Sequence, residues 1–306
     1  MSTQYPAWIW HQGKIKPWAE ATVHVMAHAL HYGSSVFEGI RAYATSKGPQ
    51  IFRLHDHMKR LYSSAHIYDM HIPFDIETLK NGCREVIKAN HLAEAYLRPI
   101  AFRSVGGFGL GADNPTEVAI AAWTWGSYLG AAALAEGVDA CISTWRRVAP
   151  NTLPAAAKAG GNYLSSILIS REAKRLGFHE GIALSVDGLV SEGAGENLFL
   201  IFDGIIITPP IAASILHGIT RDTVMKLAKE EGIEVREQAV TREMLYLCDE
   251  LFMTGTAAEV TPVRSVDRKP IGNGKAGPIS LKLQAKYFDL VKGKTDDPRG
   301  WLDLVA

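Results

Sequence analysis

Cysteine and surplus charge are both scarce in this sequence. Three cysteines occur in 306 residues, Cys83, Cys141 and Cys248, and no two of them form a CxxC pair. Their spacing therefore indicates neither a zinc site nor a redox dithiol, and it suits a reducing, cytoplasmic location. The 32 basic and 32 acidic side chains cancel, so the net charge favours neither nucleic acid nor an anionic membrane as a partner.

Long apolar runs are also scarce. One uncharged stretch, residues 118–135, approaches the length of a membrane-spanning helix. Gly126, Ser127 and Gly130 interrupt it, and much of the rest is alanine. We therefore interpret the stretch as a buried strand that runs into a loop. The first ten residues lack a basic start followed by an apolar run, so they do not resemble a signal peptide.

The pattern that is present is an α+β one. Short apolar runs separated by turn residues predict hairpins over 8–15 and 40–53. Asp56 and Asp75 are each placed to cap a helix, because apolar residues follow both of them at helical spacing.

A change in composition predicts two domains. Residues 1–125 form a small α+β domain, and the Ala/Gly-rich stretch 126–137 is expected to be an interdomain loop. Residues 138–306 form a large α+β domain. Within it, Asn162 is expected to cap one helix and Thr220 to open another.

Lys158 is unusual among the charged residues. It lies between alanines in the segment 154–161, and no other charge occurs within seven residues before it or twelve after it. A lysine among small apolar residues can be desolvated, which disfavours the ammonium and frees the amine for Schiff-base chemistry. A solvated lysine on an alanine-rich helix is the other interpretation, but Pro154 and the Gly160–Gly161 pair argue against a regular helix.

Three further segments have the composition of a phosphate-cofactor site. Glu192 lies on a glycine-rich turn, 191–197, where a flat ring could approach the backbone closely. Residues 218–221 precede a helix, whose first N–H groups would form an anion site together with the Thr220 hydroxyl. Residues 255–258 follow a strand and could form a second one. Taken singly, each segment is more often an ordinary turn or cap.

In this order along the chain, these motifs resemble one family. The sequence is similar to the branched-chain amino acid aminotransferases, in their bacterial form, which belong to the class IV (fold type IV) enzymes that use pyridoxal 5′-phosphate (PLP). The similarity runs nearly end to end. It is strongest in 31–41 and recurs in 96–99, 150–161, 192–197, 218–222 and 255–263.

The resemblance implies a fold and a set of cofactor residues. The fold is a two-domain α+β fold of type IV, like that of D-amino acid aminotransferases. Lys158 would hold PLP as a Schiff base and move the proton at the substrate Cα, and Glu192 would pair with the pyridine nitrogen. Arg60 would bind the phosphate, with Arg53 as a nearby alternative. The remaining cofactor contacts would come from Tyr163, Ile219, Thr220 and Thr256.

The resemblance also implies the substrates. L-Leucine, L-isoleucine and L-valine would donate an amino group to 2-oxoglutarate, which becomes glutamate. The reaction would be ping-pong, and glutamate would be the amino donor in the reverse direction. Arg98, helped by Tyr96, would pair with the second carboxylate of glutamate, which is costly to bury alone. The substrate pocket would comprise Tyr32, Phe37, Gly39, Arg41, Tyr96, Arg98, Trp125, Tyr128 and Ala257. The family further implies a homodimer or homohexamer, with no nucleic acid or membrane partner.

Two classes of alternative are weighed against this interpretation. D-Amino acid aminotransferase and aminodeoxychorismate lyase share the fold, but residues 37–41 and the Tyr96-x-Arg98 pattern argue against both. A metalloenzyme would use His24, His28 and His31, yet no HExxH glutamate accompanies them. The glycine-rich segment 106–111 does not fit G-x-G-x-x-G, and we expect a mobile loop near the substrate.

Overall fold

The computed structural model describes residues 5–126 and 130–305, and the chain divides into two compact units. The first unit takes the chain up to Trp125, the short segment Ala157–Gly161, and the chain from Leu290 onward. The second takes Gly126–Ala156 and Asn162–Asp289. The predicted domains also divide after residue 125. They differ from the units at the lysine segment and at the C-terminal segment, because both of these belong to the first unit through contacts with residues far away in the sequence.

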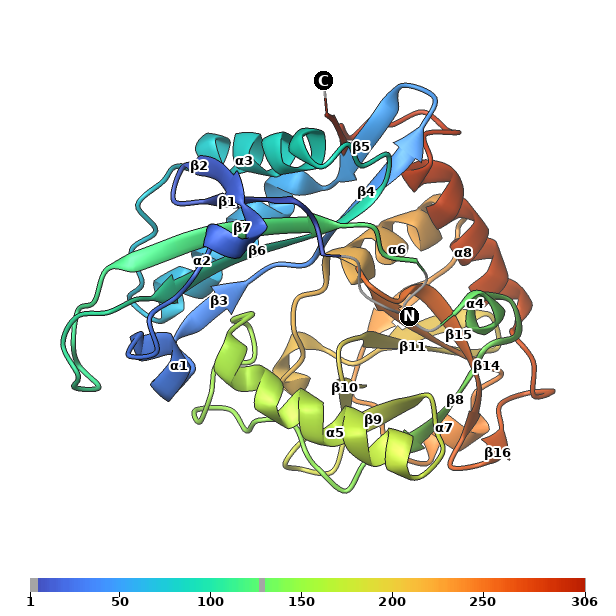
Figure 1. Ribbon diagram of the computed structural model, residues 1–306. Helices are drawn as coiled ribbons and strands as arrows, with labels where there is room; N and C mark the ends of the chain where they lie inside the picture. The colour runs from blue at the N-terminus through green and yellow to red at the C-terminus, as the bar shows by residue number, and fades with distance from the viewer. Residues whose placement is uncertain (1–4, 127–129, 306) are drawn as a thin grey trace. The chain divides into compact units, whose positions relative to one another are not determined.

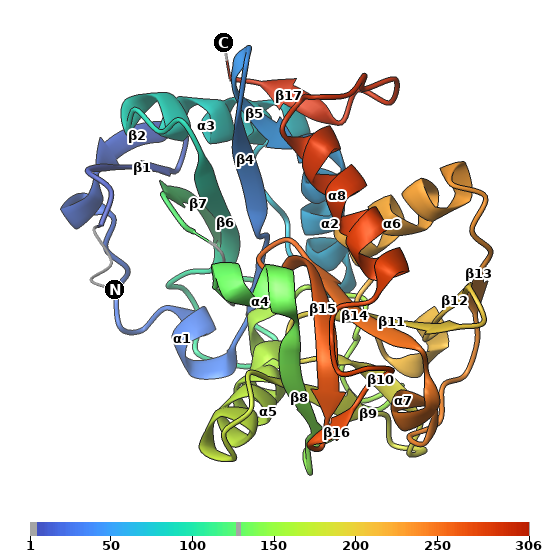
Figure 2. The ribbon, with the colours of Figure 1, turned by 90° about the vertical axis from the view of Figure 1, so that its right-hand side faces the viewer.

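The first unit is built on an eight-stranded antiparallel sheet. Its strand order is β17-β5-β4-β6-β7-β1-β2, with β3 paired to β6 (Figure 1; β17 is labelled in Figure 2). Both predicted hairpins are confirmed, as β1–β2 and β4–β5. The strands are β1 (Trp8–His11), β2 (Lys14–Pro17), β3 (Ser35–Phe37), β4 (Ile40–Thr45), β5 (Gly48–Phe52), β6 (Ala95–Arg103), β7 (Thr116–Trp123) and β17 (Leu302–Leu304).

Two long helices pack on this sheet. Helix α2 (Leu54–Ile67) contacts β3, and α3 (Ile76–Ala89) contacts β1, β2, β6 and β7. Short helical turns occur at Trp18–Glu20 and at α1 (His28–Tyr32). The core between sheet and helices includes Leu79 and Val86 of α3, both fully buried.

The two predicted helix caps have different outcomes. Asp75 caps α3, since its Oδ1 accepts a hydrogen bond from the Thr78 N–H at 2.7 Å. The prediction for Asp56 is wrong: α2 begins earlier, after Arg53, whose backbone is left-handed with φ 52°. Asp56 lies inside the first turn and accepts a 2.6 Å hydrogen bond from Arg53 Nε. An acidic residue is stabilised there by the helix dipole without being the cap.

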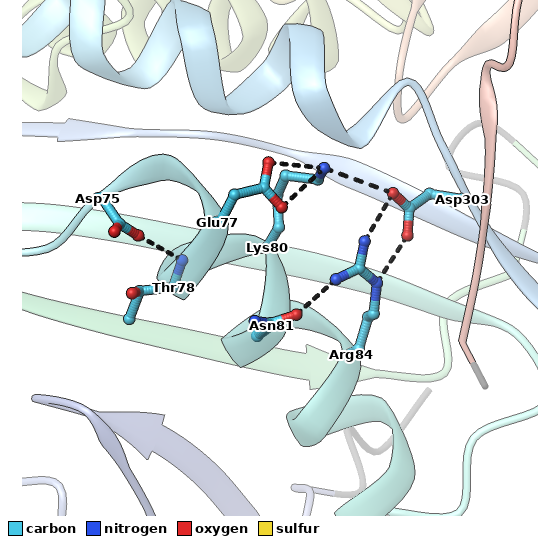
Figure 3. A network of polar contacts seen from close by, with 7 residues as sticks. All are labelled: Asp75, Glu77, Thr78, Lys80, Asn81, Arg84 and Asp303. Carbon is cyan, nitrogen blue, oxygen red and sulfur yellow. Dashed lines mark hydrogen bonds and ion pairs between the residues drawn. The ribbon is translucent and has the colours of Figure 1, made fainter.

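The last strand is fastened to α3 by charged side chains. Asp303 of β17 accepts two hydrogen bonds from Arg84, at 2.7 and 2.8 Å, and lies 3.9 Å from Lys80 Nζ (Figure 3). Glu77 binds the same lysine from the preceding turn. The C-terminal segment is therefore tied to the first unit by both strand pairing and ion pairs.

The second unit is built on a nine-stranded mixed sheet. Its order is β10-β9-β8-β15-β14-β11-β12-β13, with β16 on β15, and the pairs β8–β9, β8–β15 and β12–β13 are parallel. The strands are β8 (Val138–Ile142), β9 (Glu180–Leu184), β10 (Val190–Gly193), β11 (Asn197–Phe202), β12 (Ile205–Thr208), β13 (Val235–Glu237), β14 (Glu250–Gly255), β15 (Glu259–Val266) and β16 (Lys269–Pro270).

Helices flank this second sheet. Helix α5 packs on β9, α6 on β13 and β14, and α4 on β15 (Figure 2). Part of the predicted interdomain loop is thus the helix α4, and its Ala133 is buried in the core of the second unit. None of the helices in the described part of the chain has both the length and the apolar character needed to span a membrane. The helices are α4 (Ala131–Glu136), α5 (Tyr163–Arg175), α6 (Ile219–Glu230), α7 (Met244–Leu247) and α8 (Pro278–Val291), with 3-10 turns at Gly160–Asn162 and Ile211–Ala213.

Two predicted helix starts lie in this unit. Asn162 occupies the N-cap position of α5, but it makes no side-chain cap bond, and its amide donates to the Pro154 carbonyl at 3.0 Å. Helix α6 opens one residue before Thr220, with Gly218 at its N-cap.

Candidate active site

The lysine segment lies against β3 of the first unit. The Phe37 N–H donates to the Lys158 carbonyl at 3.0 Å, and the Lys158 N–H donates to Ser64 Oγ at 3.0 Å. An isolated bridge pairs Val36 with Ala159. Gly160 permits this close approach, because a Cβ there would lie 2.4 Å from the Ser35 hydroxyl. The backbone on either side of the lysine is therefore fixed.

Two basic side chains lie over the Phe37 ring. Lys158 Nζ lies 4.9 Å and the Arg98 guanidinium carbon 4.8 Å from its centroid. Arg98 and Tyr96 are two residues apart in β6, so their side chains lie on the same face of the sheet, and Arg98 donates to the Tyr96 hydroxyl at 3.3 Å. Its Nε is buried and, among the described residues, has no hydrogen-bond acceptor. A donor left in that state fits an acceptor supplied by a ligand.

Aromatic side chains line the neighbouring strands. Tyr96 of β6 pairs across the sheet with Arg41 of β4 on one side and Trp123 of β7 on the other. The Trp125 ring stands edge-on to Tyr96 at 4.4 Å, and its carbonyl accepts from Arg41 at 3.5 Å. The Trp123 ring lies 5.3 Å from the Tyr96 ring; Trp123 was not singled out from the sequence, and the strand register shows that the two residues are neighbours.

Gly39 lies where the Tyr96 hydroxyl comes closest to the backbone. A Cβ built on Gly39 would meet that oxygen at 2.1 Å and the ring carbon that bears it at 2.9 Å. Tyr96 is 5% exposed and cannot move aside freely, since Trp123 and Trp125 pack against its ring. The position therefore requires glycine.

Glu38, which the sequence did not single out, is fully buried beside these residues. Its two oxygens accept hydrogen bonds from Arg60 Nε at 2.7 Å, Arg60 Nη2 at 2.8 Å and His57 Nδ1 at 2.7 Å. Arg53, the alternative to Arg60, is engaged elsewhere, with Asp56 and over the Trp301 ring at 4.6 Å. A lone acid among Ser35–Ile40 was the available signal for Glu38.

Two further residues of the predicted pocket are Tyr32 and Tyr128. Tyr32, at the end of α1, is 50% exposed and donates to the Phe108 carbonyl at 3.2 Å, within the predicted glycine-rich loop. That segment has no regular secondary structure. Tyr128 lies outside the described residues.

In the second unit, Glu192 is the centre of a buried polar cluster. Its Oε1 lies 2.6 Å from Arg147 Nη2, and its Oε2 accepts from Asn197 Nδ2 and the Leu216 N–H, both at 3.0 Å. Arg147 is distant from Glu192 in the sequence, so no spacing along the chain could have indicated it. Asn197 lies in the glycine-rich turn 191–197, but its side-chain contact with Glu192 was not predicted. The cluster holds the Glu192 carboxylate in one orientation.

Two turns of the second unit lie beside that cluster. Gly218, at the N-terminus of α6, approaches Asn197 so closely that a Cβ would lie 1.9 Å from its Oδ1. Ile219 and Thr220, the first residues of this twelve-residue helix, are buried. Thr256 and Ala257 lie on the turn between β14 and β15, where Gly255 faces the Gly195 carbonyl. Tyr163 is the first residue of α5.

The histidine cluster makes local contacts. His24 Nδ1 accepts from the Met26 N–H, His31 Nε2 lies 3.0 Å from the Val25 carbonyl, and His28 Nδ1 lies 2.7 Å from Ser34 Oγ. Across the residues that the structure describes, no group of three His, Cys, Asp or Glu side chains is arranged to hold a metal ion.

The fold and these two sets of side chains define a class. Residues 35–266 match the family described as "Amino-transferase class IV". The chain is 56% identical to the branched-chain-amino-acid aminotransferase of Escherichia coli (strain K12), covering 100% of this chain and 99% of that one. It belongs to the family of branched-chain amino acid aminotransferases within this class.

Solved structures give the same picture of the fold. The crystal structure of the E. coli branched-chain amino acid aminotransferase has a TM-score of 0.97 at 55% identity, covering 98% of this chain and 100% of that one. The branched-chain amino acid aminotransferase from Thermobaculum terrenum, in its PLP-bound form, has a TM-score of 0.92 at 36% identity, covering 99% of each chain. The predicted type IV fold is confirmed.

Proposed function

We propose that Lys158 carries PLP and that the residues around Phe37 receive the substrate of this transaminase. The protein is a branched-chain-amino-acid aminotransferase that uses PLP. The observation that best supports the residue assignment is the Phe37 ring, over which the Lys158 amine and the Arg98 guanidinium both lie. A nucleophile, an apolar wall and a cation are thereby present in one cluster.

The side chains suit PLP. Glu192 is a buried, fixed carboxylate of the kind that pairs with a protonated pyridine nitrogen, and Tyr163 would contact the phenolic oxygen. When bound, PLP supplies an electron sink for the carbanion formed at the substrate Cα. Lys158 Nζ would remove the proton from that carbon, which is the step that forms the carbanion, and would later return a proton; Ser64 and Phe37 hold the lysine backbone for this role.

Donors for the phosphate come from side chains and from a helix. Arg60 offers a guanidinium whose orientation is fixed by Glu38. The first N–H groups of α6, at Ile219 and Thr220, form an anion site at a helix N-terminus, and the Thr256 hydroxyl adds a further donor. Each assignment rests on the surroundings of the residue within its own unit and on the family.

Dual substrate use follows from the composition of the pocket. Phe37 and Trp125 offer apolar surface to a branched aliphatic side chain, while Arg98 offers charge to the second carboxylate of glutamate. We propose that the unmatched Nε of Arg98 donates to that carboxylate. Arg41 adds positive charge, and Tyr32, Gly39, Tyr128 and Ala257 complete the proposed pocket.

We further propose that the protein assembles as a homodimer or homohexamer in the cytoplasm. The support for assembly is a group of exposed apolar side chains in the first unit, which a monomer would leave in water: Leu30, Tyr32, Phe108 and Leu110, exposed by 65%, 50%, 68% and 80%. The support for the location is three free, buried cysteines.

The replacement Lys158→Ala tests the function directly. We expect the visible absorbance of the lysine-bound cofactor to disappear and transamination between L-leucine and 2-oxoglutarate to be lost, while the fold is retained because the lysine backbone makes the structural contacts. Absorbance spectra, a coupled assay and circular dichroism measure these outcomes. Retained turnover would contradict the assignment.

A further inference from the structure

One face of α2 carries Arg60, the predicted phosphate ligand, and also contacts the backbone of Lys158. His57, Arg60 and Ser64 are spaced i, i+3 and i+7, so they lie on the same side of the helix. Ser64 accepts from the Lys158 N–H, while Arg60 and His57 both bind Glu38. Glu38 itself directly follows Phe37, whose N–H donates to the Lys158 carbonyl.

The contact between Glu38 and Arg60 is a bidentate one on a single edge of the guanidinium. Glu38 uses Oε1 for Nε and Oε2 for Nη2, and the side chains of Glu38 and Arg60 are 0% and 12% exposed. Because Glu38 holds this edge, the plane of the guanidinium and the direction in which it faces are fixed. His57 Nδ1 binds Oε2 and prevents the carboxylate from rotating.

The charges of the cluster are settled by burial. Burial raises the pKa of Glu38, but the Arg60 charge and the hydrogen bonds from Arg60 and His57 outweigh it and hold that pKa well below its usual range. Burial lowers the pKa of His57, and together with the neighbouring charge of Arg60 it outweighs the Glu38 carboxylate, which raises that pKa; the ring is therefore neutral and Nδ1 is its donor. The cluster is therefore one anion, one cation and one neutral donor.

We propose that Glu38, held by His57, is a positioning residue that aims the Arg60 guanidinium at the cofactor phosphate. This inference rests on the proposed role of Arg60 as the phosphate ligand. Glu38 could affect phosphate binding in two opposite ways. If it mainly orients the Arg60 guanidinium, it strengthens phosphate binding; if it mainly neutralises the positive charge of Arg60, it weakens phosphate binding. The sign of the effect of removing its charge separates the two roles.

The test compares two probes on apoprotein: PLP and pyridoxal, which lacks the phosphate. For Glu38→Gln we expect the Kd of PLP to rise about 10- to 100-fold, the usual effect of removing a partner that orients a ligand-binding group, and the Kd of pyridoxal to stay within about twofold. Glu172→Gln is the matched control, because Glu172 is also a buried, multiply bonded carboxylate, held by Ser143 and Thr144. It should alter neither Kd.

A double-mutant cycle shows whether Glu38 acts through Arg60. Arg60→Met should weaken PLP but not pyridoxal, and adding Glu38→Gln should weaken PLP little further. Additive losses, equal losses for both probes, or tighter PLP binding in Glu38→Gln would each overturn the inference. If Arg60→Met leaves PLP binding unchanged, the phosphate role of Arg60 itself fails, which Lys158→Ala does not test.

Two milder variants keep the test decisive if Glu38→Gln does not fold. Glu38→Asp retains the charge but withdraws it from Arg60, and His57→Gln keeps a neutral donor for Oε2. Each should raise the Kd of PLP by less than Glu38→Gln would and should leave the Kd of pyridoxal unchanged. Loss of affinity for both probes in these variants would indicate a general structural role and would contradict positioning.

Discussion

At the scale of single residues, the site depends on what is missing as much as on what is present. Gly39 carries no side chain, and the Tyr96 hydroxyl occupies the space that a Cβ would take. That hydroxyl in turn accepts from Arg98. Because Gly39 has no Cβ, the Tyr96 hydroxyl can take this position and hold the Arg98 guanidinium, which is proposed to bind the second carboxylate of glutamate.

Gly39→Ala should therefore damage glutamate recognition more than leucine recognition. Its backbone φ is not in the left-handed region, so the steric conflict with Tyr96 is the main effect. We expect kcat/KM for 2-oxoglutarate to fall about 10- to 150-fold, as for a lost hydrogen bond to a charged group, and kcat/KM for branched 2-oxo acids to fall less. Tyr96→Phe should reproduce the loss, and the double variant should be no worse. Equal losses for both substrates would refute the coupling.

At the scale of elements, side chains hold neighbouring strands of the second unit together. Asp139 of β8 accepts hydrogen bonds from Arg264 Nε at 3.0 Å, Arg264 Nη2 at 2.7 Å and Ser265 Oγ at 2.6 Å, both residues of β15. The two strands run parallel, with a register shift between Val263 and Ser265. The charged carboxylate fixes this irregular register.

The hydrogen bonds from Arg264 and Ser265 lower the pKa of Asp139 to about 2. A folded-state pKa below the unfolded value stabilises the fold above about pH 4, and this stabilisation is lost as the pH falls from about 4 to about 2. Because the pair is partly exposed, we expect Asp139→Asn to cost about 1 kcal/mol at pH 6. Urea unfolding at several pH values should show the difference from wild type shrinking below pH 4; a constant difference would contradict the assignment.

At the scale of the whole molecule, the function is the exchange of amino groups between aliphatic and acidic substrates. The proposed pocket offers aromatic surface to the aliphatic substrates, as Phe37 and Trp125 illustrate. One methylene is worth about 1 kcal/mol in such surroundings.

Leucine, isoleucine and valine should accordingly be used alike. We expect their kcat/KM values, measured with 2-oxoglutarate as acceptor, to lie within about 100-fold of one another, because shape alone discriminates among them. L-Glutamate with each branched 2-oxo acid gives the reverse reaction as an internal check. A larger ratio between any two would mean that the pocket contains a contact specific to one branch.

Local sequence determined a large part of this protein. Hairpin turns, the Asp75 cap and the apolar face of α3 are set by residues within a few positions of one another, so propensity and periodicity suffice to predict them. The prediction that Asp56 caps α2 was wrong because an acidic residue is favourable both at the N-cap and within the first turn of a helix, and local sequence does not distinguish the two positions. The order of several motifs along the chain was enough to identify the family and to single out Lys158.

Tertiary structure alone decided which distant residues meet. Lys158 lies more than a hundred positions from Phe37 and about ninety from Ser64 along the chain, yet both hold its backbone within the first unit. The contacts of Glu38 likewise depend on how α2 packs on the sheet, and the close approach of Tyr96 to Gly39 depends on the position of β6. These contacts follow from strand register and long-range packing, whose free energy no window of the sequence contains.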